Sequence, residues 1–195
     1  MNLNDYTTFY HETFKPAYAD LVATIADKPQ QIIFEIENSY SHLMVYLSND
    51  AKISNEIKQS NLDKAYNHLA RATMDCYKML WTEISKFLDN IMHDKVTRAF
   101  AFNENEALIL NTWNLFKKKA QKARQEEMRS VGVDCNQTIL LYKEAVDEGM
   151  VLLEKFDYEK FKQVKKFDFV NLIKNQWVGF VSGVIASVVA HWIIS

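Results

Sequence analysis

The feature that most constrains this chain is an uncharged run near its C-terminus, WVGFVSGVIASVVAHWII, which covers residues 177–194. As a helix, eighteen residues at about 1.5 Å each would extend roughly 27 Å, close to the hydrocarbon thickness of a bilayer. Trp177 and Trp192 lie near the two ends of the run, and tryptophan prefers the level of the lipid headgroups. The run therefore predicts a single transmembrane helix.

The residues before this run predict its orientation and the domain organisation. Lysines gather on its N-terminal side, at Lys160, Lys162, Lys165, Lys166 and Lys174. Because positive flanks stay in the cytoplasm, the rest of the chain is expected there. We therefore expect a cytoplasmic helical domain over residues 1–156, a basic and aromatic juxtamembrane connector over 157–176, and the span over 177–194.

One face of the expected span is made of small or weakly polar residues. At 100° per residue these fall on the same side of the helix, and they are Gly179, Ser182, Gly183, Ala186, Ser187, Ala190 and His191. Small residues at this spacing let two helices approach closely, so the face predicts self-association, with the residues either lining a pore or packing helix against helix. The alternative is a plain anchor without a partner.

The remaining sequence predicts an all-α fold. It has four glycines and two prolines in 195 residues, and 48% of its residues are hydrophobic. Apolar residues recur at steps of three and four, which predicts helices over about 5–25, 28–48, 60–93, 103–131 and 134–156. Asp27 is the expected N-cap of the second helix, and Ser60 is expected to open the third.

The helix expected over residues 60–93 has two distinct faces. Its apolar stripe is predicted to pack inward and consists of Leu62, Tyr66, Leu69, Thr73, Cys76, Leu80, Ile84, Phe87 and Ile91. A polar row about 180° away consists of His68, Arg71, Asp75, Lys78 and Thr82. This row is either a solvated face with weak ion pairs or a contact with a ligand or another subunit.

Five cations are concentrated within two turns of the helix expected over 103–131. They are Lys117, Lys118, Lys119, Lys122 and Arg124. Such a cluster can hold the phosphates of a nucleotide or oligonucleotide, and we add His68 and Arg71 as weaker candidates for the same polyanion site. The alternative is a solvated face balanced by acidic residues elsewhere.

The sequence offers little material for catalysis. It contains no P-loop, no GxSxG motif and no set of His, Cys or carboxylate residues with zinc-site spacing. The five histidines are scattered singly. We therefore expect a protein that is not an enzyme, with no catalytic residue, cofactor or metal.

Two resemblances bear on function. The stretch from Asn67 to Lys78, NHLARATMDCYK, resembles the helical HEPN-like proteins of bacterial defence and toxin loci. In the nuclease members an arginine is followed by histidine four to six residues later, whereas Cys76, Tyr77 and Lys78 lie in this region after Arg71. An RNase activity is therefore not implied.

A helical domain followed by one C-terminal span with a small-residue face is similar to the membrane effector of the Hailong-type abortive antiphage system. The resemblance implies a homotetrameric ion channel in the bacterial inner membrane. It also implies that single-stranded oligodeoxyadenylate, made by a partner nucleotidyltransferase, holds the channel shut. The alternatives are a tail-anchored adaptor that recruits a cytoplasmic partner and a membrane-tethered HEPN-like ribonuclease.

Overall fold

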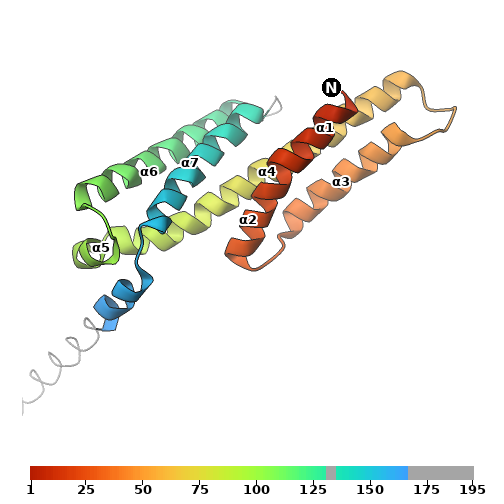
Figure 1. Cartoon of the computed structure of the whole chain (residues 1–195). Helices are drawn as coiled ribbons and strands as arrows, with labels where there is room; N and C mark the ends of the chain where they lie inside the picture. The colour runs from red at the N-terminus through yellow and green to blue at the C-terminus, as the bar shows by residue number, and fades with distance from the viewer. Residues whose placement is uncertain (131–134, 167–195) are drawn as a thin grey trace, which may run out of the picture. The chain divides into compact units, whose positions relative to one another are not determined.

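The computed structural model describes residues 1–130 and 135–166, and over these residues the chain is built from helices (Figure 1). An isolated antiparallel bridge pairs Phe102 with Phe156. The all-α prediction is thus confirmed. None of the helices in the described ranges has the length and apolar character needed to cross a bilayer. The expected span over 177–194, with its small-residue face, lies outside the described residues, as does the second half of the predicted connector, 167–176.

The chain divides into two compact units. The larger unit comprises Met1–Asp89 and Ala107–Glu154, and the smaller comprises Asn90–Glu106 with the residues from Lys155 onward. The larger unit contains α1 (Leu3–Phe9), η1 (Tyr10–Phe14), α2 (Lys15–Ile25), α3 (Gln30–Leu47), most of α4 (Asn55–Met92) and of α6 (Glu106–Arg129), and α7 (Asn136–Glu154).

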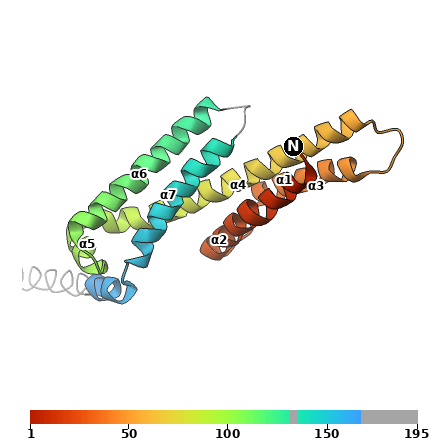
Figure 2. The same ribbon diagram turned by 45° about the horizontal axis from the view of Figure 1, so that its top comes forward.

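Within the larger unit α4 contacts helices from both ends of the sequence. Its N-terminal half lies beside α1 and α3, where Ser39 donates a hydrogen bond to the carbonyl oxygen of Ala65 at 2.7 Å (Figures 1 and 2). Helices α6 and α7 run side by side, joined by the ion pair of Lys119 and Glu148 at 2.7 Å. Side chains from several helices can therefore contact α4.

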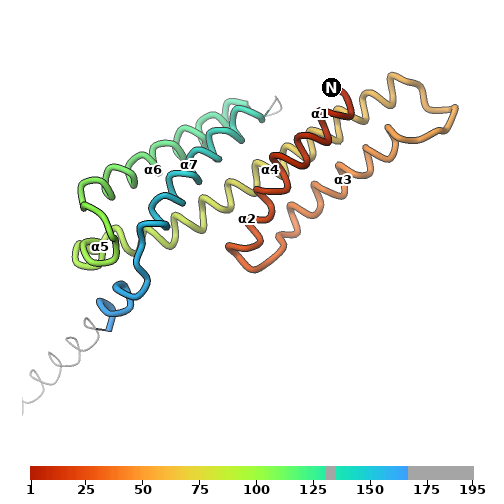
Figure 3. Tube along the Cα trace, viewed as in Figure 1, coloured from red at the N-terminus to blue at the C-terminus, as the bar shows by residue number. Residues whose placement is uncertain are grey.

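The first helical segment accommodates Pro16 without a break. Proline has no N–H to donate to the carbonyl four residues earlier, and its ring clashes with that carbonyl. The chain takes up the mismatch in the π-helical turn η1, which leads directly into α2 with Pro16 in its first turn. Within the helix that the sequence predicts over 5–25, Pro16 is expected to cause a kink or break, whereas the tube in Figure 3 follows one helical path from α1 through α2.

The structure corrects the predictions for α3. Its N-cap is Pro29, and Asp27 accepts a hydrogen bond only from the N–H of Lys28, so Asp27 is not the cap. Apolar residues at steps of three and four predict a core stripe in this helix, made of Ile33, Ile36, Tyr40, Leu43 and Leu47. That prediction is wrong in part, because Tyr40 and Leu47 are 40% and 48% exposed. The buried residues of α3 are Ile32 and Ser39, and Ser39 is accommodated because its hydroxyl bonds both Tyr6 and Ala65.

Helix α4 is longer than predicted. It begins at Asn55 and passes through Ser60 without interruption, so Ser60 is not a cap. The predicted inward stripe is largely confirmed, since seven of its nine residues are buried, and Tyr66 and Phe87 are partly exposed. Further residues outside the stripe, among them Ala70, Ala72 and Tyr77, are buried as well, because helices pack on more than one side of α4.

The smaller unit contains a short helix that the sequence analysis missed, α5 (Lys95–Ala101), capped by Asp94. Arg98 binds Glu106 at 2.7 Å and also donates to the carbonyl oxygen of Met92. Residues 158–166 are helical and follow the bridge at Phe156. Lysine and aromatic side chains meet there, with Lys162 over the ring of Tyr158 at 4.4 Å, as the basic and aromatic composition of the connector suggests.

Candidate anion-binding groove

A groove of about 760 Å³ lies between α4 and α6 in the larger unit, with one residue of α7. Its walls are cationic, amide and aromatic. The lining residues are Lys78, Trp81, Thr82, Lys117, Ala120, Gln121, Arg124, Gln125 and Tyr142. No carboxylate lines it, so the groove presents mostly hydrogen-bond donors.

The antiparallel pairing of α4 and α6 forms this groove. Lys78 contacts Glu127, and further along both helices Asp89 contacts Lys117, so the numbering rises on α4 as it falls on α6. On α6, Lys117, Gln121 and Arg124 are spaced by four and three residues and therefore lie on one face. Helix geometry thus directs two cations of α6 and one of α4 into the same groove.

Glu127 neutralises two of the groove's cations. One carboxylate oxygen lies 2.7 Å from Lys78 Nζ, while the other lies 2.7 Å from Arg124 Nη1 and accepts the hydroxyl of Tyr142 at 2.8 Å. Burial of this carboxylate opposes its ionisation, but the hydrogen bonds from Lys78, Arg124 and Tyr142 hold the pKa of Glu127 below its ordinary value. Burial and the bond to Glu127 raise the pKa of Tyr142, which therefore remains a phenol donor.

Trp81 supplies the groove with an unsatisfied donor. Its indole Nε1 is buried and has no hydrogen-bond partner among the described residues. The ring lies against the buried ring of Phe116, with centroids 6.3 Å apart. Because a buried N–H without a partner costs free energy, an acceptor atom of a ligand in the groove would remove that cost.

The five residues of the predicted basic cluster fall into three groups in the structure, according to what their side chains contact. Lys117 and Arg124 line the groove, while Lys119 turns to α7 and pairs with Glu148. Lys118 and Lys122 are exposed, and neither has a partner in the described part of the chain. The cluster is therefore not one continuous site, and carboxylates from α4, α6 and α7 balance three of its five members.

The two weaker polyanion candidates lie outside the groove lining. His68 binds Glu35 of α3 at 2.7 Å and stacks on His42, with ring centroids 5.3 Å apart. Arg71 is exposed on α4. Most of the polar row on α4 contacts neighbouring helices instead of solvent alone, since Asp75 accepts from Gln31 of α3 and Lys78 pairs with Glu127 of α6.

Asp75 is the most buried charged group of this row, at 9% exposure. Burial raises its pKa, although the hydrogen bond from Gln31 and the charge of Lys78 act in the opposite direction. A carboxyl whose folded-state pKa is raised binds its proton more tightly when folded, so wild-type stability declines as the pH rises from the unfolded pKa through the folded one.

We therefore expect Asp75→Asn to be more stable than wild type at pH 7, with the difference shrinking as the pH is lowered toward 4. Thermal unfolding followed by circular dichroism across this range measures the effect. Asp20→Asn, at an exposed position of α2, is the control and should show no such pH-dependent difference. A difference for Asp75→Asn that grows on acidification would contradict the prediction.

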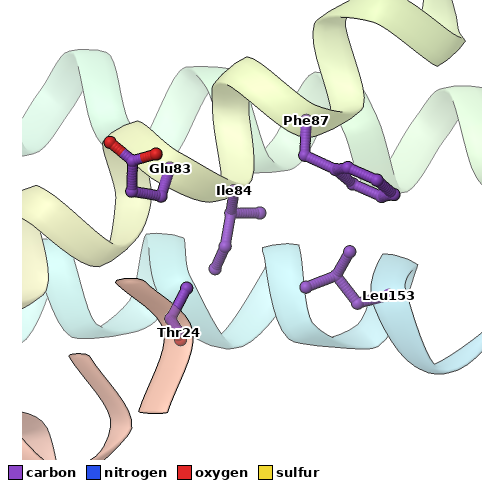
Figure 4. Close-up of a pocket in the computed structure, with 5 residues that line it drawn as sticks. All are labelled: Thr24, Glu83, Ile84, Phe87 and Leu153. Atoms are coloured by element: carbon purple, nitrogen blue, oxygen red, sulfur yellow. The ribbon is translucent and has the colours of Figure 1, made fainter. Parts of the chain in front are cut away.

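A second pocket in the larger unit is apolar. It has a volume of about 360 Å³ and is lined by Thr24, Glu83, Ile84, Phe87 and Leu153. Ile84, Phe87 and Leu153 face its interior from α4 and α7 (Figure 4). Its one charged residue, Glu83, is paired with Lys86 at 2.6 Å. This pocket therefore lacks the polar groups that would fix a charged ligand.

The described residues do not provide a metal site, and the buried cysteine of α4 is not an activated thiol. They contain no group of three or more His, Cys, Asp or Glu side chains able to hold a metal ion. Burial raises the pKa of the Cys76 thiol to about 12, so Cys76 is poorly suited to be a nucleophile.

Comparisons of the chain with protein-family models, with curated proteins and with solved structures find no match. The groove is therefore interpreted from its own residues. The sequence analysis predicted Lys117 and Arg124 as anion ligands and gave Lys78 and Thr82 as part of a row that could contact a ligand. It did not group these residues with one another or with Trp81, Gln121 and Gln125. Only the pairing of α4 with α6 brings these residues together.

Proposed function

We propose that this protein is a membrane effector controlled by a nucleotide or oligonucleotide. Its helical domain binds the phosphates of that ligand in the groove between α4 and α6. The segment 177–194 anchors the chain in the bacterial inner membrane, associates with copies of itself, and forms a regulated ion-conducting pore. This agrees with the resemblance to the Hailong-type effectors, which adds a homotetramer and a partner nucleotidyltransferase to the proposal.

The observation that carries the ligand-binding part is the donor set of the groove. Lys78, Lys117 and Arg124 supply positive charge, Gln121 and Gln125 supply amides, and Trp81 supplies a buried N–H without a partner. Cations that bind phosphate at a partly enclosed site make charge-assisted hydrogen bonds, which are stronger than neutral ones. An aromatic wall beside them suits the flat ring of a nucleobase.

The test compares two double variants that remove the same charge. Lys78→Gln with Arg124→Gln removes two groove cations, whereas Lys118→Gln with Lys122→Gln removes two exposed cations elsewhere on α6. We expect the groove variant to weaken binding of a short single-stranded oligonucleotide by about tenfold or more and to reduce the slope of log affinity against log salt by about 2. The control should change affinity by less than about twofold, as expected for cations without phosphate contacts.

Binding is measured by titration calorimetry on the full chain in detergent, and thermal unfolding confirms that each variant is folded. Equal losses for the two double variants would indicate non-specific attraction to a basic surface. Absence of binding to any nucleotide or oligonucleotide at low salt would remove the ligand-controlled part of the proposal.

A tail-anchored adaptor is the second candidate, favoured by the surface of α3. Large apolar side chains are exposed along this helix, with Phe34 and Met44 each 59% exposed and Leu47 48% exposed. Exposed apolar side chains on one helix offer contact area that a partner protein can cover. An adaptor would not dissipate the membrane potential when expressed, whereas a pore would.

A further inference from the structure

We propose that Glu127 is an internal competitor for the phosphate of the ligand, so that a phosphate-bearing ligand binds the groove by displacing the Glu127 carboxylate from Lys78 and Arg124. This inference rests on the proposed function of the groove. It adds a regulatory residue to that site and specifies a tetrahedral oxyanion as the group that takes its place.

The first argument is geometric. Lys78 Nζ and Arg124 Nη1 come from different helices, and each lies 2.7 Å from a different oxygen of the same carboxylate. The Tyr142 hydroxyl donates to one of these oxygens at 2.8 Å. Three donors thus converge on one anionic group, and a phosphate has enough oxygens to accept from all three.

The second argument is that these donors belong to the groove and the carboxylate does not. Lys78, Arg124 and Tyr142 all line the groove, whereas Glu127 is not among its lining residues and its side chain is 16% exposed. A ligand that enters the groove therefore meets the three donors and competes with Glu127 for them. Trp81 also lines the groove, and its buried indole N–H has no partner in the described part of the chain, so a ligand acceptor that reaches this N–H would make a contact that Glu127 does not already use.

The third argument concerns coupling between helices. Glu127 of α6 is tied to Lys78 of α4 and to Tyr142 of α7. A phosphate that takes over the cations also removes the bond between Glu127 and Tyr142, and α7 is the helix that leads toward the C-terminal segment of the chain. Ligand binding thereby changes the contact between α6 and α7.

The test uses sodium tripolyphosphate as the probe and the full chain in detergent at low salt, with titration calorimetry as the measurement. Glu127→Gln keeps the shape of the side chain and removes its charge, so the two cations become available and the affinity should rise by about tenfold or more. Glu126→Gln is the matched control, because it removes the same charge from the neighbouring residue of α6. The Glu126 side chain contacts neither Lys78 nor Arg124 in the described part of the chain. Its affinity should stay within about twofold of wild type.

Glu127→Asp provides a second route in case Glu127→Gln does not fold. It leaves both cations and Tyr142 in place and shortens the side chain by one methylene, so the carboxylate can no longer reach both cations at hydrogen-bond distance and affinity should rise by a few fold. If neither wild type nor these variants bind tripolyphosphate, the proposed function of the groove fails. If wild type binds and the folded variants bind no more tightly, the site stands and the role of Glu127 is overturned.

Discussion

Replacing Gly149 by leucine should abolish the cooperative unfolding transition of the helical domain, and replacing it by alanine should destabilise the domain by about 1–2 kcal/mol. A Cβ atom at Gly149 would lie 2.8 Å from Ile84 Cγ2 and 2.8 Å from Phe116 Cε2, closer than such atoms pack in proteins. Phe116 is fully buried and Ile84 is 3% exposed, so neither has free space to move into.

Whether Gly149→Ala stabilises or destabilises the domain depends on two opposing contributions, helix propensity and overpacking of the core. Alanine in the interior of a helix is about 1 kcal/mol better than glycine, whereas overpacking a dense core costs about 1–3 kcal/mol. With two close contacts on the same new atom, we expect the packing cost to exceed the gain in helix propensity. A net stabilisation of Gly149→Ala would show that the core relaxes at this point.

Thermal unfolding followed by circular dichroism measures both variants against Met150→Ala, an adjacent position of α7 that is 46% exposed. Phe116→Leu removes the ring that a Cβ at Gly149 would meet. Phe116→Leu alone should be destabilising, but combined with Gly149→Ala the two effects should be less than additive. The smaller side chain at 116 relieves the close contact of the new Cβ, and the new Cβ fills part of the space that the ring leaves. Strict additivity would exclude a direct clash.

The two predicted apolar stripes, on α3 and α4, show how far helical periodicity can predict which residues are buried. On α4 the pattern extends over many turns, and the residues it selects are largely those that are buried. On α3 the same rule selects Tyr40 and Leu47, which are exposed, and passes over Ser39, which is fully buried. The side of α3 that is covered depends on Tyr6 of α1, whose hydroxyl lies 2.9 Å from that of Ser39. A contact between residues so far apart in sequence leaves no periodic signal.

The same limit applies to the groove. The density of cations on α6 is visible in the sequence, but their partners Asp89 and Glu148 come from other helices. Which cations face the groove is decided by the register of α4 against α6, and tertiary pairing fixes this register. A composition-based argument consequently overestimates the size of the site, since it counts Lys118 and Lys122 together with Lys117 and Arg124.

A chain that ends at Gln176 should move from the membrane fraction to the supernatant after an alkaline carbonate wash, while the full chain stays in the membrane fraction. Residues 177–194 contain nine Val, Ile and Phe residues, which together favour insertion by about 4 kcal/mol on the biological insertion scale. Glycine, serine and histidine oppose part of this gain, so the net free energy that favours insertion of the segment is small.

Because the net free energy of insertion is small, charged substitutions within the segment provide a control that keeps the chain at full length. An arginine at the centre of a span costs about 2.5–3.5 kcal/mol, so Ile185→Arg with Val188→Arg should release the protein as completely as the truncation does. Ile185→Leu with Val188→Leu keeps the segment apolar and should leave it in the membrane. If the truncated chain stays in the membrane fraction after the carbonate wash, residues before 177 hold it in the bilayer, and the prediction that 177–194 is the anchor is overturned.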